Sequence, residues 1–282
     1  MLIGIISALS AVAAVLTCVG TEAFASAQWL WMLPVSFIGG FLSCAVLVFL
    51  FLLAVCAVVD PDKQQEEDSK FYRTVIDICA DTILTFARIR VQTEGLEKTP
   101  KDGRFLLVSN HLHDGDPVVL LRHFKRSQLA FVGKREVKDM FIVGKLMPKI
   151  LSQFINREND REALKTILRC IQLLKEDKVS IAIFPEGYIH KDRKFHQFRH
   201  GVFKIAQKAK VPIVVCTLHN TENMIKNFLK LKPTTVKLHL LDVIPAESLQ
   251  GRTTVEIGHE IHEMMAKDLG PEYMPAEQED NT

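Results

Sequence analysis

The first 62 residues contain no lysine and no arginine, which sets them apart from the rest of this 282-residue chain. Their only charged side chains are Glu22, Asp60 and Asp62, so the segment carries −3 while the remaining 220 residues carry +5. An apolar head without cations, joined to a mildly basic body, argues against a wholly soluble protein. The total charge of only +2 excludes strong nucleic-acid binding through charge alone, so we expect no nucleic-acid partner.

Closely spaced cysteines are also missing, because none of the six belongs to a Cys-x-x-Cys pair. Three lie in the apolar head and three are scattered over the body, which excludes a disulfide framework and indicates a reducing compartment. Internal repeats are absent as well. The six cysteines are Cys18, Cys44, Cys56, Cys79, Cys170 and Cys216.

Two long uncharged runs fill the head, at residues 2–19 and 29–59. The first would be about 27 Å long as a helix, which just spans the hydrocarbon core of a bilayer. A signal peptide is the alternative for this run, but it requires a positively charged start, and only the amino terminus is charged there. We therefore predict that residues 1–62 are a membrane anchor of two apolar transmembrane helices, which form a hairpin.

The cations that follow the second run predict the orientation of this anchor. The loop between the runs has no lysine or arginine, whereas Lys63, Lys70 and Arg73 come soon after the second run. The positive-inside rule then predicts an integral membrane protein whose body faces the cytoplasm. Apolar residues recur at helical spacing between residues 63 and 90, which predicts an amphipathic linker helix, either beside the membrane or under the body.

Beyond residue 90, short β-rich runs alternate with helical patterns. Asn159 and Glu162 are suited to a capping box at the start of a helix whose apolar face includes Leu164 and Leu168. Such alternation predicts an α/β fold with a mostly parallel sheet covered by helices, over residues 91–270, and we expect residues 271–282 to be a disordered tail. The predicted strands are residues 105–109, 129–132, 179–184, 213–217 and 236–241.

The stretch 108–117 places two histidines and two aspartates just after a predicted strand, where parallel sheets hold their active sites. Three interpretations compete. A two-metal pattern of the type His-x-His-x-Asp-His fails at Gly115 and Asp116, which disfavours a metal, and none is expected. The polar residues could simply cap the following helix. The third interpretation is a general-base pair of His111 and Asp116.

Residues Asn110-His111, followed after four residues by Asp116, resemble the first motif of the membrane glycerolipid acyltransferases, in particular the 1-acylglycerol-3-phosphate (lysophosphatidic acid) acyltransferases. Further stretches resemble the later motifs in the same order. These are Phe154-Ile155-Asn156-Arg157, Phe184-Pro185-Glu186-Gly187, Phe198-Arg199-His200-Gly201-Val202-Phe203 and Val211-Pro212-Ile213-Val214. The resemblance covers about residues 90–245.

The chain departs from this pattern at two places. Asn156 stands where the second motif usually has an acid, which changes local hydrogen bonding more than chemistry. The third motif usually continues with Thr or Ser and then Arg, but here Tyr188 and Ile189 follow, so one phosphate-binding cation is missing. The loop 191–194, with two lysines and an arginine, either replaces that charge or is a solvated loop.

The chemistry can be argued from the residues themselves. Acyl transfer from a thioester to an alcohol needs a base, and neutral histidine suits this task because its ordinary pKa is about 6.5. We expect His111 to be the base and Asp116 to fix its tautomer and stabilise the imidazolium. The acceptor hydroxyl can attack directly, so we expect no acyl-enzyme.

The remaining requirement is to hold an anionic lipid near the base. Arg157 is suited to phosphate by its planar guanidinium, although a surface ion pair with Glu158 or Asp160 is the alternative. Gly187 allows close backbone approach, and Glu186 either binds a glycerol hydroxyl or orients Arg157. Further candidates for substrate binding are Lys134 and Arg193; His113 and Asp114 are expected only to line the site.

The resemblance therefore implies an enzyme of phospholipid biosynthesis. It would transfer an acyl group from acyl-CoA or acyl carrier protein to the sn-2 hydroxyl of lysophosphatidic acid, giving phosphatidic acid, without a cofactor. The alternatives are an acyltransferase for another lysophospholipid or for glycerol 3-phosphate, a catalytically inactive lipid-binding protein, and a metallohydrolase.

Overall fold

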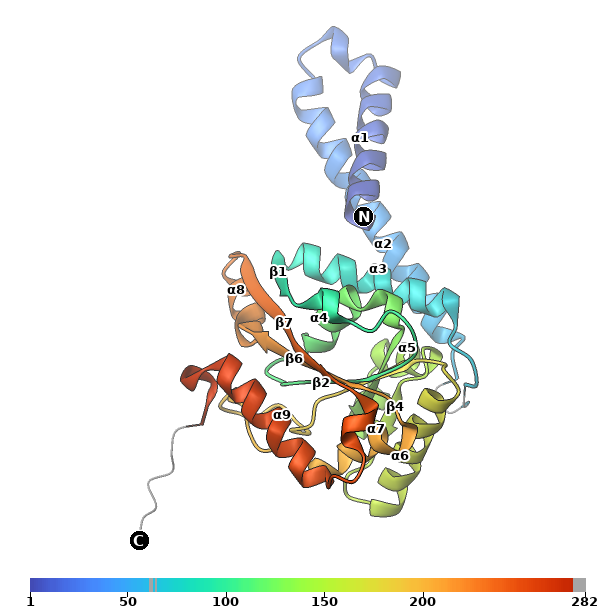
Figure 1. Ribbon diagram of the computed structural model, residues 1–282. Coiled ribbons are helices and arrows are strands. Elements are labelled where there is room, and N and C mark those ends of the chain that lie inside the picture. The colour runs from blue at the N-terminus through green and yellow to red at the C-terminus, as the bar shows by residue number, and fades with distance from the viewer. Residues whose placement is uncertain (61–62, 64, 276–282) are drawn as a thin grey trace. The chain divides into compact units, whose positions relative to one another are not determined.

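The computed structural model describes residues 1–60, 63 and 65–275 (Figure 1). The chain divides into two compact units, residues 1–62 and 63–282. Its α-helices are α1 (Leu2–Gly20), α2 (Trp29–Ala57), α3 (Lys70–Phe86), α4 (Asp116–His123), α5 (Val143–Lys149), α6 (Asp160–Lys175), α7 (Lys204–Ala209), α8 (Met224–Leu229) and α9 (Thr254–Leu269). Its strands are β1 (Ile89–Glu94), β2 (Leu106–Ser109), β3 (Leu129–Lys134), β4 (Gln153–Ile155), β5 (Ser180–Ile183), β6 (Ile213–His219) and β7 (Thr234–Ile244).

The strands of the second unit form one sheet in the order β1-β7-β6-β2-β5-β3-β4 over the described residues. Every neighbouring pair is parallel except β6 and β7, which run antiparallel. The predicted α/β fold with a mostly parallel sheet is therefore confirmed. Two strands lie outside the predicted set, β1 and β4. Both are at the edges of the sheet, where β1 is largely exposed and β4 has only three residues.

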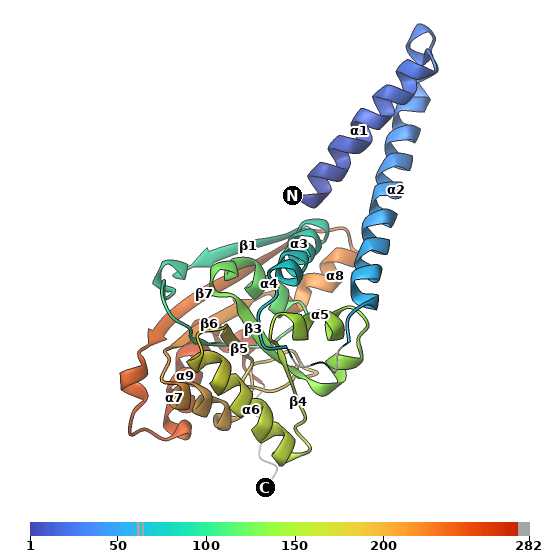
Figure 2. The ribbon, with the colours of Figure 1, turned by 90° about the vertical axis from the view of Figure 1, so that its right-hand side faces the viewer.

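Alternate residues along the central strands pack into separate cores on the two faces of the sheet. Leu106 and Val108 of β2 face one core, with side chains of α6, α7 and α9. Leu107, between them, faces the other core, with side chains of α3, α4 and α8. Figures 1 and 2 show these two helical layers. Because strand side chains alternate in direction, a central strand covered on both faces must be apolar throughout, as β2 is before Ser109.

The helices on either side of the sheet differ in how well the sequence predicts their faces. The amphipathic helix expected within residues 63–90 forms as α3. The helix expected after Asn159 forms as α6, and the Asn159 side chain accepts hydrogen bonds from the backbone N–H groups of Arg161 and Glu162 at 3.1 Å each. The predicted burial of Leu164 and Leu168 was wrong, because both are more than half exposed. Instead, α6 packs against the core with the face that carries Cys170, Leu173 and Leu174.

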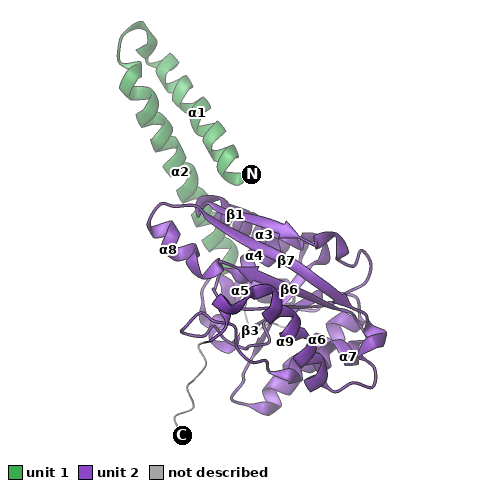
Figure 3. Ribbon diagram, turned by 60° about the vertical axis from the view of Figure 1, so that its left-hand side comes forward, with its two compact units in different colours: residues 1–62 green, residues 63–282 purple. Residues whose placement is uncertain are grey.

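The first unit is a helical hairpin, as predicted (Figure 3). The buried face of α1 has one residue every fourth position, Ile6, Ser10, Ala14 and Cys18. Small side chains at such spacing let two apolar helices approach closely, and Gly40 of α2 lies beside Ser10. Both helices are long and apolar enough to cross a membrane.

The last part of the second unit is tied to the loop that follows β5. The backbone N–H of Phe195 donates to the carbonyl of Tyr273 at 2.8 Å, and the Tyr273 hydroxyl accepts from the N–H of Asn220 at 2.8 Å. The expected disordered tail, residues 271–282, thus begins with an ordered turn at Pro271–Tyr273. Residues 276–282 lie outside the described residues.

Candidate active site

Four parallel neighbours, β2, β5, β3 and β4, place their carboxyl ends along one edge of the sheet. The predicted site residues follow these ends. His111 comes two residues after β2, Glu186 three residues after β5, Lys134 ends β3 and Arg157 lies two residues after β4. The topology therefore brings residues from four separated segments to one edge, as expected for the active site of a parallel sheet.

His111 and Asp116 form the pair that the sequence predicts. Nδ1 of His111 lies 2.9 Å from Oδ2 of Asp116, which is completely buried at the first turn of α4. The same oxygen accepts the backbone N–H groups of Leu112 at 2.8 Å and His113 at 2.9 Å. Because this oxygen acts as an acceptor for both amides, the ring nitrogen must donate to it, which places the proton on Nδ1. In the neutral ring this tautomer leaves the lone pair on Nε2, the atom that can act as a base.

Phe184 and Glu186 hold the His111 residue from the side of β5. The Phe184 ring stacks on the imidazole, with ring centroids 4.0 Å apart and planes 10° from parallel. Oε1 of Glu186 accepts the backbone N–H of His111 at 2.8 Å. Ring orientation and backbone position are thus fixed by two residues of the third motif, while the imidazole keeps a partly exposed edge.

Glu186 is a buried bridge between the two loops that enclose the site. Its Oε2 accepts the backbone N–H of His196 at 2.9 Å, so each carboxylate oxygen is bound to a different loop. Burial raises the pKa of Glu186 to about 8, despite these two hydrogen bonds. Glu186 is only 2% exposed, and one of its oxygens holds the backbone of His111 in place.

Gly187 lies where two arginines converge. Its φ of +93° favours glycine, and a Cβ atom there would lie 2.9 Å from Nε of Arg199 and 3.4 Å from Nη1 of Arg157. Burial, followed by the neighbouring charge of Arg199, lowers the pKa of the Arg157 guanidinium. In the described part of the chain, Arg157 forms no ion pair with Glu158 or Asp160. The guanidinium groups of Arg157 and Arg199 lie next to a turn that has no side chain at Gly187. Two adjacent cations of this kind are suited to a dianionic group such as a phosphate monoester.

Arg199 is the residue that sequence reasoning missed. It belongs to the Phe198-Arg199-His200-Gly201 stretch, which was matched to a family motif without any role for the arginine. Its backbone N–H donates to the carbonyl of Pro185 at 2.9 Å, which fixes this stretch against the third motif. The sequence did contain a signal for its role: Arg199 is a cation in a stretch that resembles a family motif, and the third motif lacks its usual cation at Ile189.

The other predicted cations have different partners. Nζ of Lys134 pairs with Glu136 at 2.8 Å at the surface, and Glu136 also acts electrostatically on Arg157. Nη1 of Arg193 donates to the carbonyl of Leu112 at 2.7 Å, so this side chain braces the first motif. Lys194 donates to the carbonyl of Glu272. Two cations of the loop 191–194 thus bind backbone carbonyls.

An apolar cavity of about 240 Å³ lies between α3, α4 and α8, close to the first motif. His113 and Gly115 form part of its wall, together with Leu84, Met224 and Phe228. The Nδ1 atom of His113 accepts the N–H of Gly115 at 2.9 Å, and burial lowers the pKa of this histidine, which favours the neutral ring. His113 thus lines this cavity.

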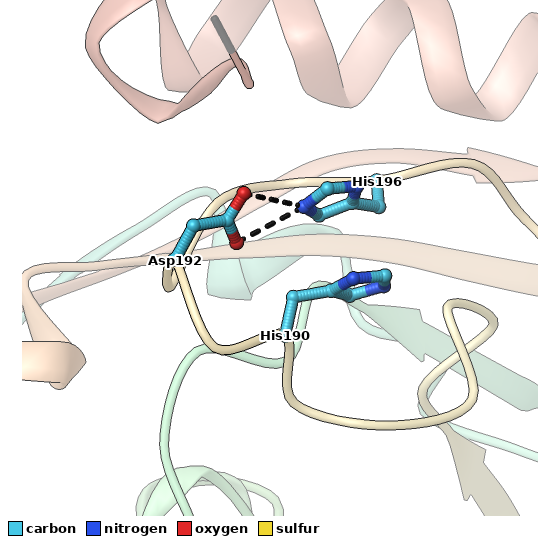
Figure 4. Close-up of side chains that lie close together, drawn as sticks. All are labelled: His190, Asp192 and His196. Carbon is cyan, nitrogen blue, oxygen red and sulfur yellow. Dashed lines mark hydrogen bonds and ion pairs between the residues drawn. The ribbon is translucent and has the colours of Figure 1, made fainter.

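His190, Asp192 and His196 form a group of three possible metal ligands in the loop after β5 (Figure 4). Their ligand atoms lie within 4.8 Å of one another. The two imidazoles, however, stack 3.5 Å apart and 11° from parallel. Lone pairs of ring nitrogens lie in the ring planes, so a single ion cannot meet both at a normal distance of about 2.1 Å. As arranged, the group orders the loop through the hydrogen bonds between Asp192 and Nε2 of His196.

The His-Asp pair at the carboxyl edge of this α/β sheet is suited to general-base catalysis. Residues 90–219, which are 130 of the 282 residues, match the acyltransferase family model. The expected resemblance to 1-acylglycerol-3-phosphate acyltransferases is confirmed. The "1-acyl-sn-glycerol-3-phosphate acyltransferase" of Borreliella burgdorferi is 27% identical over 195 residues, which is 68% of this chain and 76% of that protein.

A "probable 1-acyl-sn-glycerol-3-phosphate acyltransferase" of Mycoplasma pneumoniae is 30% identical over 153 residues, 53% of this chain and 54% of that protein. The chain thus spans about half the length of this relative. The crystal structure of the 1-acyl-sn-glycerophosphate (LPA) acyltransferase PlsC from Thermotoga maritima has the same fold, with a TM-score of 0.61 and 21% identity. The match covers 79% of this chain and 87% of the Thermotoga chain.

Proposed function

We propose that this chain transfers an acyl group from an acyl thioester to the sn-2 hydroxyl of lysophosphatidic acid, giving phosphatidic acid. The observation that carries the proposal is the His111 imidazole, bound to buried Asp116 through Nδ1 at 2.9 Å and free at Nε2, with the Arg157 and Arg199 pair at the adjoining turn. The names of the relatives support this substrate.

In the proposed reaction, Nε2 of His111 takes the proton from the acceptor hydroxyl as its oxygen attacks the thioester carbonyl carbon. The new C–O bond forms and the C–S bond breaks. The imidazolium, stabilised by Asp116, then returns its proton to the leaving thiolate. Atoms and charges balance without an acyl-enzyme, a metal or a cofactor.

The two arginines at Gly187 are assigned to the phosphate of the lysolipid. This phosphate carries no head group, so it presents a full dianion that two guanidiniums can bind through several N–H donors. Glu186 adjoins Gly187 and also binds the backbone of His111, so one turn links the phosphate subsite to the base. The pair Arg157 and Arg199 takes the place of the cation that Ile189 removes from the third motif.

The apolar cavity beside His113 is assigned to an acyl chain. Its wall is formed by apolar side chains and by the first motif, two to four residues from the base. The hairpin of α1 and α2 is assigned to anchoring the enzyme in a bilayer, with the catalytic unit on the cytoplasmic side because the cations follow α2. Acyl-CoA and acyl carrier protein are the candidate donors.

The test is an acyl-transfer assay of the purified full-length chain in detergent-lipid micelles. A panel of acceptors would contain lysophosphatidic acid, lysophosphatidylcholine, lysophosphatidylethanolamine and glycerol 3-phosphate, each with acyl-CoA and with acyl carrier protein. We expect phosphatidic acid from lysophosphatidic acid, and no product with the His111→Ala variant. Faster acylation of an acceptor with a head group, or of glycerol 3-phosphate, would assign the chain to another reaction of the family.

A further inference from the structure

In the second unit, α3, α8 and the turn after α8 together expose a group of large apolar side chains. Leu229 and Leu231 are 75% and 74% exposed, and Phe86 at the end of α3 is 68% exposed. Contiguous apolar surface of this kind marks an interaction site on a soluble unit. We call the set the α3–α8 patch: Ile83, Phe86, Ile225, Phe228, Leu229 and Leu231.

The patch is one continuous surface, because α3 and α8 touch. The rings of Phe86 and Phe228 lie 5.7 Å apart, and Nη1 of Arg88 donates to the carbonyl of Leu231 at 3.0 Å. Both helices lie on the same side of the sheet (Figure 2). Phe86, Ile225 and Phe228 are exposed and also line the apolar cavity. The cavity beside the first motif therefore opens onto this patch.

On the α8 side of the patch, the charge has one sign. Lys226, Lys230 and Lys232 alternate with its apolar residues along α8 and the turn that follows, and no Asp or Glu occurs from residue 223 to residue 241. Apolar side chains interleaved with lysines suit the interface of an anionic bilayer, where the apolar groups enter the acyl region and the cations remain at the head groups. A protein partner would not require such regular alternation.

We propose that the α3–α8 patch docks on the surface of an anionic bilayer, as a membrane contact separate from the α1–α2 hairpin. The cavity then opens directly to lipid, and a long-chain lysolipid enters the site without crossing water. The entry of a lysolipid through this cavity rests on the proposed function, whereas the docking of the patch on a bilayer does not.

The docking can be measured without any enzymatic assay. Trp29 and Trp31 are the two tryptophans of the chain, so W29F and W31F provide a background for a single new tryptophan. In full-length protein reconstituted into phosphatidylglycerol-containing vesicles, lipids brominated on their acyl chains should quench the fluorescence of Leu229→Trp. The matched control is Leu164→Trp, an exposed leucine of α6 on the opposite helical layer, which should not be quenched. Absence of quenching at 229, or equal quenching at both positions, would overturn the proposal.

A second measurement tests the entry route. Leu229→Ser with Leu231→Ser should lower the acylation rate of a long-chain lysolipid presented in vesicles by about 10-fold, because the apolar docking area is lost. Acylation of a short-chain lysolipid dissolved in water should not change, nor should either rate in the control Leu164→Ser with Leu168→Ser. Equal loss with both substrates, or no loss with either, would overturn the lateral entry. A wild-type chain without acyltransferase activity would contradict the proposed function, and the quenching result would still decide the docking.

Discussion

The orientation of one imidazole depends on three neighbours of His111. Asp116 fixes the proton on Nδ1, Phe184 fixes the plane of the ring, and Glu186 holds the backbone N–H. The first neighbour comes from α4 and the other two from the turn after β5. The imidazole is thus held between two elements, which would keep Nε2 in one position for the proposed reaction.

At the residue scale, we predict that His111→Ala lowers kcat by at least about 10²-fold, and up to about 10⁴-fold, because the proton acceptor is lost. Asp116→Asn should be similarly severe, since an amide can donate to Nδ1 and favour the wrong tautomer. Steady-state kinetics on folded, vesicle-bound protein measure both effects, with binding of lysophosphatidic acid retained. A near-normal rate in either variant would refute the mechanism, and rescue by added zinc would favour a metal site.

The arginine pair at Gly187 gives a second prediction at this scale. Arg157→Ala and Arg199→Ala should each raise KM for lysophosphatidic acid about 10- to 150-fold, because a charge-assisted hydrogen bond to phosphate is worth about 1.5–3 kcal/mol. KM for the acyl thioester should remain unchanged. Arg161→Ala removes an exposed arginine of α6 and serves as the control.

The same KM measurements distinguish two candidate sources of the positive charge that binds phosphate, Arg199 and the loop 191–194. If neutralising Lys191 and Lys194 raised KM for lysophosphatidic acid more than Arg199→Ala does, the loop 191–194 and not Arg199 would replace the missing third-motif cation. The structure favours Arg199, because Lys194 already donates to the carbonyl of Glu272.

At the scale of elements, the turn after β5 organises the site. Glu186 binds the N–H of His111 on one side and that of His196 on the other, while Gly187 makes room for the arginines. A bulkier residue at 187 would have to displace a guanidinium and also adopt a strained φ of +93°. The turn therefore connects His111, the two arginines and the loop 188–199, which include the proposed base and the proposed phosphate subsite.

The burial of Glu186 predicts a pH dependence of stability. Its folded-state pKa of about 8 lies above the ordinary value of 4.5, so the folded state binds more protons than the unfolded state between these values. This contribution to stability is fully present below the unfolded pKa and is lost as pH rises through the folded pKa. Relative to Glu186→Gln, the wild type should therefore lose up to about 1.4 kcal/mol of unfolding free energy per pH unit between about pH 5 and pH 8.

Thermal or denaturant unfolding of both proteins in the same detergent, followed by far-ultraviolet circular dichroism, measures this difference. Glutamine has the size of the acid but only one acceptor oxygen, so the variant loses one of the two backbone hydrogen bonds at every pH, and the test compares only how the stability difference changes with pH. A difference between wild type and variant that does not change with pH would show that the Glu186 pKa is not raised.

At the scale of the whole molecule, the two units differ in composition and structure. The hairpin of α1 and α2 is apolar on its outer surface, and the body carries the sheet and the site. Lysolipids and their products have long acyl chains, and each CH₂ group moved into water costs about 0.8 kcal/mol. In the proposed function, attachment to the bilayer would avoid this cost for both substrate and product.

We predict that the full-length chain resists extraction by alkaline carbonate and that protease added outside intact cells does not cut the body. The first result follows from two uncharged helices of membrane length, and the second from the cations that follow α2. Immunoblotting after each treatment measures both. A mature amino terminus near residue 25 would instead identify α1 as a cleaved signal peptide, and cleavage of the body from outside would reverse the orientation.

The sequence by itself determined the features that depend on local composition or on short motifs. Uninterrupted apolar runs specify α1 and α2, because a helix that is apolar all round has no polar face to place in water. The central strands were also predictable, since strands covered on both faces are apolar throughout. The pair His111 and Asp116 could be chosen because its two members lie only five residues apart.

Only the tertiary structure decided what depends on distant segments meeting. The edge strands β1 and β4 lack a strong apolar signal and owe their conformation to pairing with β7 and β3. Arg157 and Arg199 are 42 positions apart in sequence, and no local pattern shows that both reach Gly187. Likewise, Arg193 was expected to bind substrate, but its Nη1 donates a hydrogen bond to the carbonyl of Leu112. Residue type predicts what a side chain can bind, whereas the fold decides which partner lies within reach.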